Sequence, residues 1–376
     1  MTMCELTYKV SFNTPAFLGN AEQQAQWRTP PFKALLRQWW RVVKAPAVGY
    51  DHKQLLAAEN ALFGSALDGE GSSRSQVRLR LSAWDAGALA ELPRMATHQH
   101  PEVKDSRTGQ LRSIGTSVYL GFGPVTTTGN RTAISPEATA VTFKLRFPAS
   151  EEPTLRKAMQ LAAWFGTLGS RARNGWGSLH IEGEGILGWA ELCDSNLAEQ
   201  SPLRSVASAL GDRLAGDWPH AVGLCADGRP AVWRVVAGST VKEGKTAYVG
   251  FDHWRLVMEQ LAALKIGFRT QFKLNSGAPH SRVEDRHILA YPVTNHDLAG
   301  LPNARLASQM RFKVVKSKGG QYFGLITHLP SAMPRAFFER SSVRPPEIQD
   351  QVAVWQQVHK FLNAQSPTLL NRIRKG

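Results

Sequence analysis

Cysteine is scarce in this sequence, and the few cysteines it has are far apart. Cys4, Cys193 and Cys225 are the only three in 376 residues, and none belongs to a CxxC or CxxH pair. That spacing excludes a disulfide framework and a cysteine-based zinc site, so we expect no metal. Unpatterned cysteines are typical of a reducing compartment, which predicts a cytoplasmic protein.

Long apolar runs are also missing. No stretch approaches the roughly 20 residues of a membrane-spanning helix. The first twelve residues, MTMCELTYKVSF, alternate as in a strand and contain no apolar core of a signal peptide. We therefore expect no membrane partner.

The common signatures of cofactor and hydrolase chemistry are absent as well. The GKT at Gly244 resembles a P-loop, but Ser239 stands where that motif requires its first glycine. There is no GxSxG and no HExxH, and the glycines of residues 166–177 do not fit the dinucleotide-binding pattern. No cofactor and no catalytic residue is predicted from these motifs.

Acidic residues are outnumbered by basic ones. The chain has 45 Lys and Arg against 30 Asp and Glu, for a formal net charge of +15. This excess favours a polyanionic partner, but by itself it does not separate RNA from DNA or from an anionic membrane.

The length suits two domains, and the order of elements suggests their type. The first half alternates strand and helix patterns as β-α-β-insertion-β-α-loop-β, which is close to a ferredoxin-like (RRM-like) order. Similar parts recur in the second half, with strands expected at 268–274 and 287–291. We therefore predict an α+β protein with tandem ferredoxin-like domains. The first domain is expected at residues 1–193, a linker at 194–217 and the second domain at 218–376.

A predicted helix near the N-terminus carries a basic row. Its apolar residues follow helical spacing, and Lys33, Arg37 and Arg41 fall four apart on another face. Arg28 precedes the row, and no acidic residue occurs between Arg28 and Lys44. Such a row repels itself, so a bound polyanion is one interpretation and a solvated helix face is the other.

Residues 166–177, GTLGSRARNGWG, form the most distinctive stretch. Four glycines frame Arg171, Arg173, Asn174 and Trp176. Glycine permits positive φ, arginine clamps phosphates and tryptophan offers a stacking surface for bases. We hypothesise an RNA-binding loop; the alternative is a glycine-rich helix end with solvated arginines.

Other polar residues leave catalysis open. His280 and His287 bracket a dense charged cluster that suits either a nuclease-like site or a solvated loop. Asp51 follows the basic helix without an evident partner. His98 and His100 share one side of a strand, but sequence fixes no third metal ligand.

Five blocks of sequence, in this order, resemble a known family. They are NTPAFLGN, RTPPFKALLRQWWR, AENALFG, YLGFG and GSRARNGWGSL. In combination they resemble the RAMP superfamily of CRISPR effector proteins, and within it most closely the first subunits of Cmr (type III-B) complexes. The resemblance covers residues 5–185 well and 310–330 loosely. The irregular, polar segment 85–115 matches poorly.

The resemblance implies a fold, partners and site residues. It implies tandem ferredoxin-like domains in a subunit that binds guide (CRISPR) RNA and target RNA beside other Cas subunits in antiviral defence. The subunit would be an end cap or a backbone member, and not the one that cuts the target. The alternative is a RAMP ribonuclease that processes guide RNA or cleaves target RNA. The implied RNA-binding residues are Arg28, Lys33, Arg37, Arg41, Arg171, Arg173, Asn174 and Trp176, with the cations on phosphates and Trp176 stacking on a base or sugar.

Overall fold

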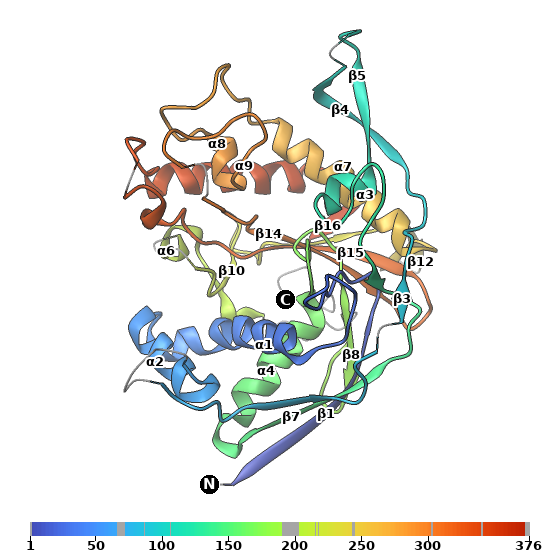
Figure 1. Ribbon diagram of the computed structural model, residues 1–376, viewed down its shortest axis with the longest axis vertical. Coiled ribbons are helices and arrows are strands. Elements are labelled where there is room, and N and C mark those ends of the chain that lie inside the picture. Colours follow the sequence, from blue (N-terminus) through green and yellow to red (C-terminus); the bar gives the residue numbers. More distant parts are fainter. Residues whose placement is uncertain are drawn as a thin grey trace.

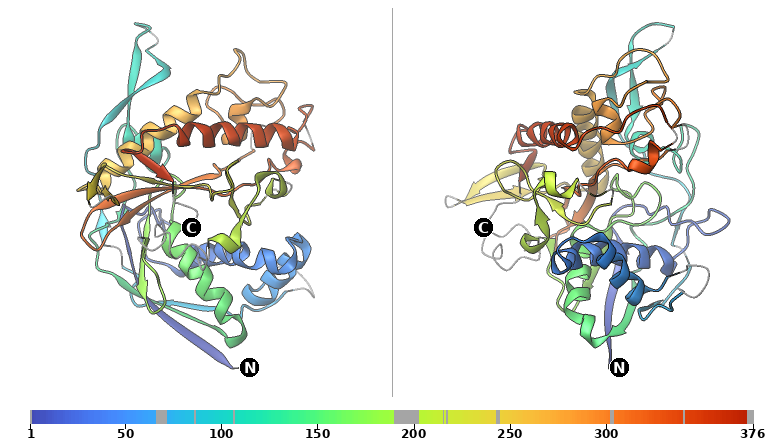
Figure 2. Two further views of the ribbon diagram at one scale, coloured as in Figure 1. Left: turned by 180° about the vertical axis from the view of Figure 1, so that it is seen from behind. Right: turned by 90° about the vertical axis from the view of Figure 1, so that its left-hand side faces the viewer.

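Two four-stranded antiparallel sheets and their helices make up most of the computed structural model (Figure 1). It describes residues 2–65, 72–85, 87–105, 107–189, 203–214, 216, 218–242, 245–301, 304–339 and 341–372. The elements form four layers: the first sheet, its helices, the second sheet and the second sheet's helices. Figure 2 shows the blue and green helices of the first half on one side of the second sheet, and the red helix of the second half on the other, together with the teal strands 97–104 and 111–115.

The first sheet has the strand order β2-β7-β1-β8. Its elements follow one another as β1 (Met3–Phe12), α1 (Thr29–Lys44), β2 (Arg78–Leu81), β7 (Val141–Pro148), α4 (Glu152–Phe165) and β8 (Leu179–Gly183). Every pairing within it is antiparallel. This β-α-β-β-α-β order with the first and third strands central is the ferredoxin-like arrangement.

Alternation along β1 explains which face of the first sheet is covered. Leu6, Tyr8 and Val10 are buried, whereas Thr7 and Lys9 between them are exposed. The buried side packs on α1 and α4, which contact each other, and α1 turns Phe32, Leu36, Trp39 and Trp40 inward. The other face of this sheet stays open to solvent.

The second sheet repeats the topology with the order β14-β15-β11-β16. Its elements are β11 (Val232–Val235), α7 (Trp254–Thr270), β14 (Met310–Lys316), β15 (Tyr322–His328), α9 (Ile348–Asn363) and β16 (Leu370–Arg372). All its pairings are antiparallel. The predicted tandem ferredoxin-like fold is therefore confirmed. Because α1 and α4 cover one face and α7 and α9 the other, β11 and β15 are buried almost throughout.

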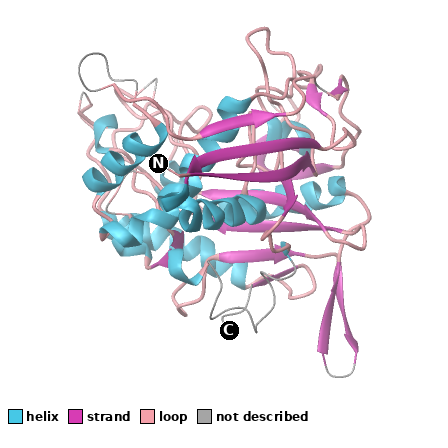
Figure 3. Cartoon of the chain, turned by 90° about the horizontal axis from the view of Figure 1, so that it is seen from below, coloured by secondary structure: helices cyan, strands magenta, loops and turns pink. Residues whose placement is uncertain are grey.

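A long insertion separates β2 from β7. The structure shows it to be ordered, with β3 (Ala88–Leu89), β4 (Thr97–Lys104), β5 (Leu111–Gly115), α3 (Thr116–Gly121) and β6 (Ala133–Ile134). The antiparallel pair β4–β5 projects from the body at the top of Figure 1. The hairpin that projects in Figure 3 is a different one, formed by β12 (Gly238–Lys242) and β13 (Lys245–Val249). The expectation of an irregular segment at 85–115 was wrong, because its mixed polar residues concealed a solvent-exposed hairpin.

The remaining elements are short or peripheral. The helical ones are η1 (Ala45–Val48), α2 (His52–Phe63), η2 (Ala149–Glu151), η4 (Arg204–Val206), α6 (Leu210–Arg213), α8 (Asp285–Leu289) and η5 (Arg335–Phe337). The strands are β9 (Ala207–Ser208), β10 (Val222–Gly223), β12 (Gly238–Lys242) and β13 (Lys245–Val249). Among the described residues, no helix is long and apolar enough to cross a membrane.

Two strands expected in the second half are not strands. Residues 268–270 complete α7, and residues 285–289 form α8. Short apolar runs do not separate strand from helix by periodicity alone, and here the longer amphipathic pattern of α7 continued through Phe268. The predicted linker lies partly outside the described residues, so the domain boundaries stay predictions.

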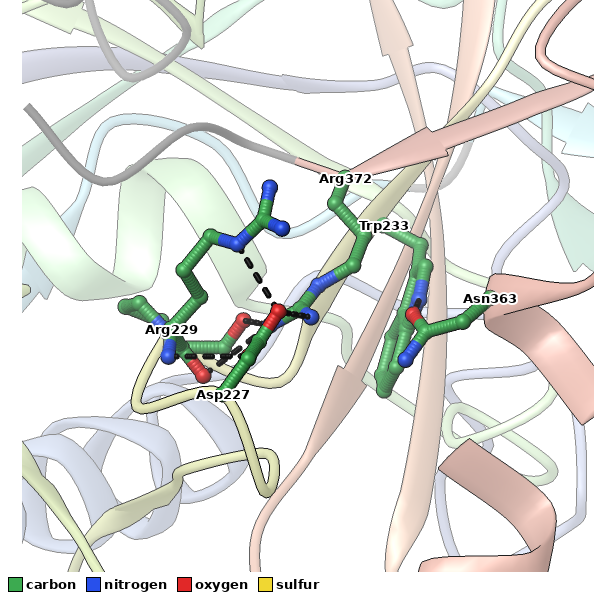
Figure 4. A network of polar contacts seen from close by, with 6 residues as sticks. Asp227, Arg229, Trp233, Asn363 and Arg372 are labelled. Carbon is green, nitrogen blue, oxygen red and sulfur yellow. Dashed lines mark hydrogen bonds and ion pairs between the residues drawn. The ribbon is translucent and has the colours of Figure 1, made fainter. Parts of the chain in front are cut away.

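The last strand is fastened to the start of the second sheet (Figure 4). The Arg372 guanidinium bonds Asp227 at 2.7 Å, and Arg229 Nε bonds the same carboxylate at 2.9 Å. Trp233 Nε1 donates to Asn363 Oδ1 at 2.9 Å. Although its partial burial opposes this, hydrogen bonds from Arg372 and Arg229 lower the pKa of Asp227 to about 2. The network joins the first and fourth strands of the second sheet to α9.

Candidate nucleic-acid interface

The glycine-rich loop 166–177 is built around close backbone contacts. Gly169 and Gly177 have φ values of 98° and 60°. A Cβ on Gly169 would lie 2.7 Å from the Phe17 carbonyl oxygen, and one on Gly177 only 1.9 Å from the Leu168 oxygen. The glycines are thus required by packing as well as by backbone conformation.

The same loop joins the two domains. The backbone N–H of Phe312 on β14 donates to the Arg173 carbonyl at 2.9 Å. Val314 N donates to Ser178 Oγ at 2.8 Å, and Asn13 Nδ2 donates to the Val314 carbonyl at 3.1 Å. The edge strand β14 of the second sheet is therefore hydrogen-bonded to the first domain. These bonds fix the two domains in one orientation.

Trp176 is part of this junction. Its side chain is 0% exposed, and it packs against Phe17 and edge-on against Trp254 of α7. A base needs a free ring face to stack on. The predicted stacking role of Trp176 is therefore wrong; the indole anchors the loop in the core of the second domain.

A cleft of about 1690 Å³ opens beside the junction. Its walls come from the outer edge of α1, the glycine loop, the β4–α3 insertion and the segment 265–311. Its eight basic residues are Arg171, Arg173, Lys265, Arg269, Lys273, Arg286, Arg305 and Arg311. Glu102 is the one acidic residue among the described residues that line it. A concave surface of this charge concentrates polyanions.

Three of the predicted residues lie in this cleft. Arg173 Nη1 donates to the Ser308 carbonyl at 2.7 Å, and Asn174 Nδ2 donates to the Leu120 carbonyl at 2.8 Å. Arg171 is exposed, and its Nε donates to the Phe122 carbonyl at 2.5 Å. These contacts hold the side chains in place and leave part of the Arg171 guanidinium open to the cleft.

Burial and neighbouring positive charges lower the pKa values of two cations in the cleft. Burial, with added repulsion from Arg269 and Arg171, lowers the pKa of Lys265 to about 7. Its ammonium donates to Asn174 Oδ1 at 2.8 Å and lies 5.5 Å from the Tyr119 ring. Burial, with repulsion from Arg173, lowers the pKa of Arg311 to about 9. An anion in the cleft would relieve this repulsion.

Glu102 on β4 crosses the cleft to the second domain. It forms an ion pair with Arg286 and a second one with Lys273, whose Nζ lies 3.2 Å from Oε1. Partial burial opposes ionisation, but the two cations outweigh it and lower the pKa of Glu102. The carboxylate thus competes with a phosphate for these cations, although the Lys273 side chain, which is 72% exposed, stays accessible.

The basic row of α1 lies outside the cleft and has an acidic partner. Arg37 Nε lies 2.5 Å from Glu59 Oε1, and Arg41 binds the same carboxylate. Glu59 comes from α2 and is 1% exposed. Burial would raise its pKa, but hydrogen bonds and charge from Arg41 and Arg37 outweigh this and lower it. The sequence left a bound polyanion and a solvated helix face as the two interpretations of this row, and for Arg37 and Arg41 the tertiary fold supplies Glu59 instead.

Two further predicted residues also lie apart from the cleft. Arg28 precedes α1, and its Nη1 donates to the Gly19 carbonyl at 2.7 Å. Lys33 is half-buried on α1, and burial together with Arg37 lowers its pKa. Neither residue lines the cleft. The structure therefore divides the eight predicted residues between a cleft, a helix face and a buried junction.

The charged cluster at 280–287 is a structural network. His280 and His287 are 6% and 0% exposed. His280 Nδ1 lies 2.9 Å from Glu284 Oε1, and its Nε2 lies 2.9 Å from His296 Nδ1. Glu284 and His287 form the capping box that begins α8. These bonds use the imidazoles that a general acid–base pair would need free.

The other catalytic and metal candidates also have local roles. Asp51 accepts from Gln54 N at 2.8 Å and caps α2. His98 Nε2 lies 3.0 Å from Thr116 Oγ1, and His100 is 5% exposed. In the described part of the chain, no group of three or more His, Cys, Asp or Glu is arranged to hold a metal.

Sequence reasoning missed most of the cleft. Lys265 and Arg269 sit four residues apart on α7, which is a detectable signal for one helix face. Arg286 on α8, Arg305 in a loop and Arg311 on β14 come from separate segments. No local pattern joins them, because the fold of the second domain brings them together and its docking on the first domain adds Arg171 and Arg173.

Comparison with known proteins finds a family match in the first half of the chain. Residues 9–180 match the family model described as the RAMP superfamily. The match begins within β1, includes the insertion and the glycine loop, and ends at the start of β8. No curated protein is significantly similar to this chain in sequence.

Solved structures provide further similarities. One is the crystal structure of Cmr1 from Pyrococcus furiosus in its apo form, with 16% identity, a TM-score of 0.45 and coverage of 93% of each chain. Another is a chain of the type III-B Cmr-beta complex bound to cognate target RNA, with 10% identity, a TM-score of 0.41 and coverage of 96% of this chain and 99% of that one.

Proposed function

We propose that this chain is a non-catalytic RNA-binding subunit of a type III CRISPR ribonucleoprotein, because residues 9–180 match the family model described as the RAMP superfamily. In that complex it contacts guide RNA and target RNA and assembles with other Cas subunits. The proposal includes the predicted resemblance to the first subunits of Cmr complexes. The proposal covers two positions of the chain in that complex, at the end or within the backbone.

One observation supports RNA binding above the others. The cleft collects eight Lys and Arg against a single carboxylate, and it does so at the junction of two ferredoxin-like domains. Cations on phosphates supply most of the affinity for nucleic acid and make that affinity dependent on salt. The fixed orientation of the domains gives the cleft its shape before any ligand arrives.

The charge of the cleft also indicates how RNA is held. Arg171 and Lys273 are accessible and suit phosphate contacts, whereas Arg173 and Arg311 are largely engaged by protein groups. The inner arginines then contribute long-range attraction, and the outer cations make direct contacts. Such division favours binding that depends little on base sequence.

The test begins with the protein in its native complex. The chain is purified from a host that carries its own CRISPR locus, and co-purifying RNA and proteins are sequenced. Repeat-derived RNA of discrete length, together with other Cas subunits, supports the proposal. A chain that carries no RNA, and that binds none at low salt when purified alone, contradicts it.

A ribonuclease of the same superfamily is the second candidate. His100 and His296 line the cleft, and imidazole is the side chain most often used in general acid–base catalysis. If the protein cleaves RNA and His296→Ala abolishes cleavage while RNA affinity is kept, the ribonuclease is favoured. Intact RNA after incubation with the complex supports the non-catalytic subunit.

A further inference from the structure

Phe122 is an exposed aromatic residue at the edge of the cationic cleft. Its side chain is 64% exposed, and it lines the cleft directly after α3. Trp84 is the other large aromatic with a strongly exposed side chain among the described residues, and it does not line the cleft. Burying a phenyl ring would ordinarily stabilise the fold, so its position beside the cations calls for a ligand.

The glycine loop fixes the backbone that carries this ring. Arg171 Nε donates to the Phe122 carbonyl at 2.5 Å, and Asn174 Nδ2 donates to the Leu120 carbonyl at 2.8 Å. Arg171 itself holds a left-handed conformation with φ 58°. Two side chains of the glycine loop thus hold the backbone that carries the ring before a ligand binds.

The guanidinium of Arg171 lies close to the same turn. A Cβ built on Gly123, whose φ is 111°, would be only 3.7 Å from Arg171 Nη2. A cation and an exposed aromatic face therefore lie within the dimensions of one nucleotide. Phosphate and base are the two parts of RNA that these groups recognise.

We propose that Phe122 stacks on an unpaired base of single-stranded RNA while Arg171 contacts the adjoining phosphate. This assignment rests on the proposed RNA-binding function and gives Phe122 the stacking role that the buried Trp176 does not have. The ligand class is a single strand, because a base within a duplex is already stacked on both faces. Stacking of this kind tolerates any base, since every base has a π-face.

The experiment measures affinity of the full chain for a single-stranded RNA and for the same RNA with abasic sites. Phe122→Ala is expected to weaken binding of the ordinary RNA by about 5- to 150-fold, the range that base stacking contributes. The abasic RNA is expected to bind the wild type weakly and to show no further loss with Phe122→Ala. Phe122→Trp is expected to retain affinity, and Trp84→Ala is the matched control for loss of an exposed ring.

The outcomes separate the stacking site from the proposed function. Unchanged affinity in Phe122→Ala, or an equal loss on ordinary and abasic RNA, overturns the stacking site while RNA binding itself stands. A wild-type chain that binds no single-stranded RNA overturns the proposed function. Loss of association with a Cas subunit, with RNA affinity unchanged, makes Phe122 a protein contact and also overturns the proposal.

Discussion

Removing two accessible cations from the cleft should reduce both the affinity for RNA and its dependence on salt. Arg171 is exposed, and the Lys273 side chain is 72% exposed, so Arg171→Gln with Lys273→Gln removes charge without emptying the core. Each phosphate contact on a single strand contributes about 0.7 to the slope of log K against log salt. The double variant should therefore lower the magnitude of that slope by about 1.4.

The same figure gives the expected loss of affinity. Over one decade of salt, from 1 M to 0.1 M, two lost contacts amount to about 1.4 logarithmic units. At 0.1 M salt the double variant should bind single-stranded RNA about 25-fold more weakly than the wild type. Fluorescence anisotropy at several salt concentrations measures both quantities, and a thermal unfolding curve checks that the fold is intact.

The control must remove the same charge elsewhere. Arg78 and Arg80 are exposed on β2, at the edge of the first sheet, and line no part of the cleft. Arg78→Gln with Arg80→Gln should leave the slope and the affinity nearly unchanged. If the control loses affinity and the cleft variant does not, the reasoning is refuted and the RNA lies on the open face of the first sheet.

Three further predictions concern single residues. Glu102→Gln should strengthen RNA binding and steepen its salt dependence, because two cations of the cleft are released; weaker binding would show that Glu102 orders the cleft instead. Glu59→Gln should lower the free energy of unfolding at neutral pH by about 1–3 kcal/mol through lost charged hydrogen bonds. Because Arg41 and Arg37 lower the pKa of Glu59, the contribution of Glu59 to the free energy of unfolding is present above the ordinary pKa of 4.5 and is lost as pH falls through the pKa of the folded state. Denaturant titrations in which the wild type and Glu59→Gln show equal pH dependence would contradict this. RNA affinity should fall as pH rises above about 7, by up to about tenfold per pH unit, because a phosphate favours protonated Lys265, whose pKa burial lowers to about 7. The Lys265→Met variant should bind RNA with no such dependence on pH. If that variant shows the same dependence of affinity on pH as the wild type, Lys265 is not its cause.

Several features of the fold follow from local sequence alone. Alternation at β1 and β7 and the apolar stripe of α1 each bury one face against the same core, so periodicity located the elements. The glycine loop was correctly singled out, but its function was only partly visible. Glycine density signals a constrained backbone, yet it does not tell whether the close partner is a ligand or another part of the chain. Here the close partners of Gly169 and Gly177 are the carbonyls of Phe17 and Leu168, and the loop also accepts a hydrogen bond from the edge of β14.

Misassigned residues share a cause. Arg37 and Arg41 looked unpaired because Glu59 lies on the next helix, and Trp176 looked available because burial by Trp254 involves a residue far along the chain. The periodicity of a sequence predicts which side of one helix or strand is buried. It does not predict contacts with other helices or strands, which depend on tertiary packing.

The sequence by itself determined the class of the fold, the excess of positive charge and the resemblance that the match over residues 9–180 confirms. These depend on composition and on patterns that repeat within a single helix, strand or loop. Only the tertiary structure decided which cations form one surface. The cleft draws Arg171, Lys265 and Arg286 from distant segments, and their proximity depends on how the two sheets dock, a contact that no local pattern encodes.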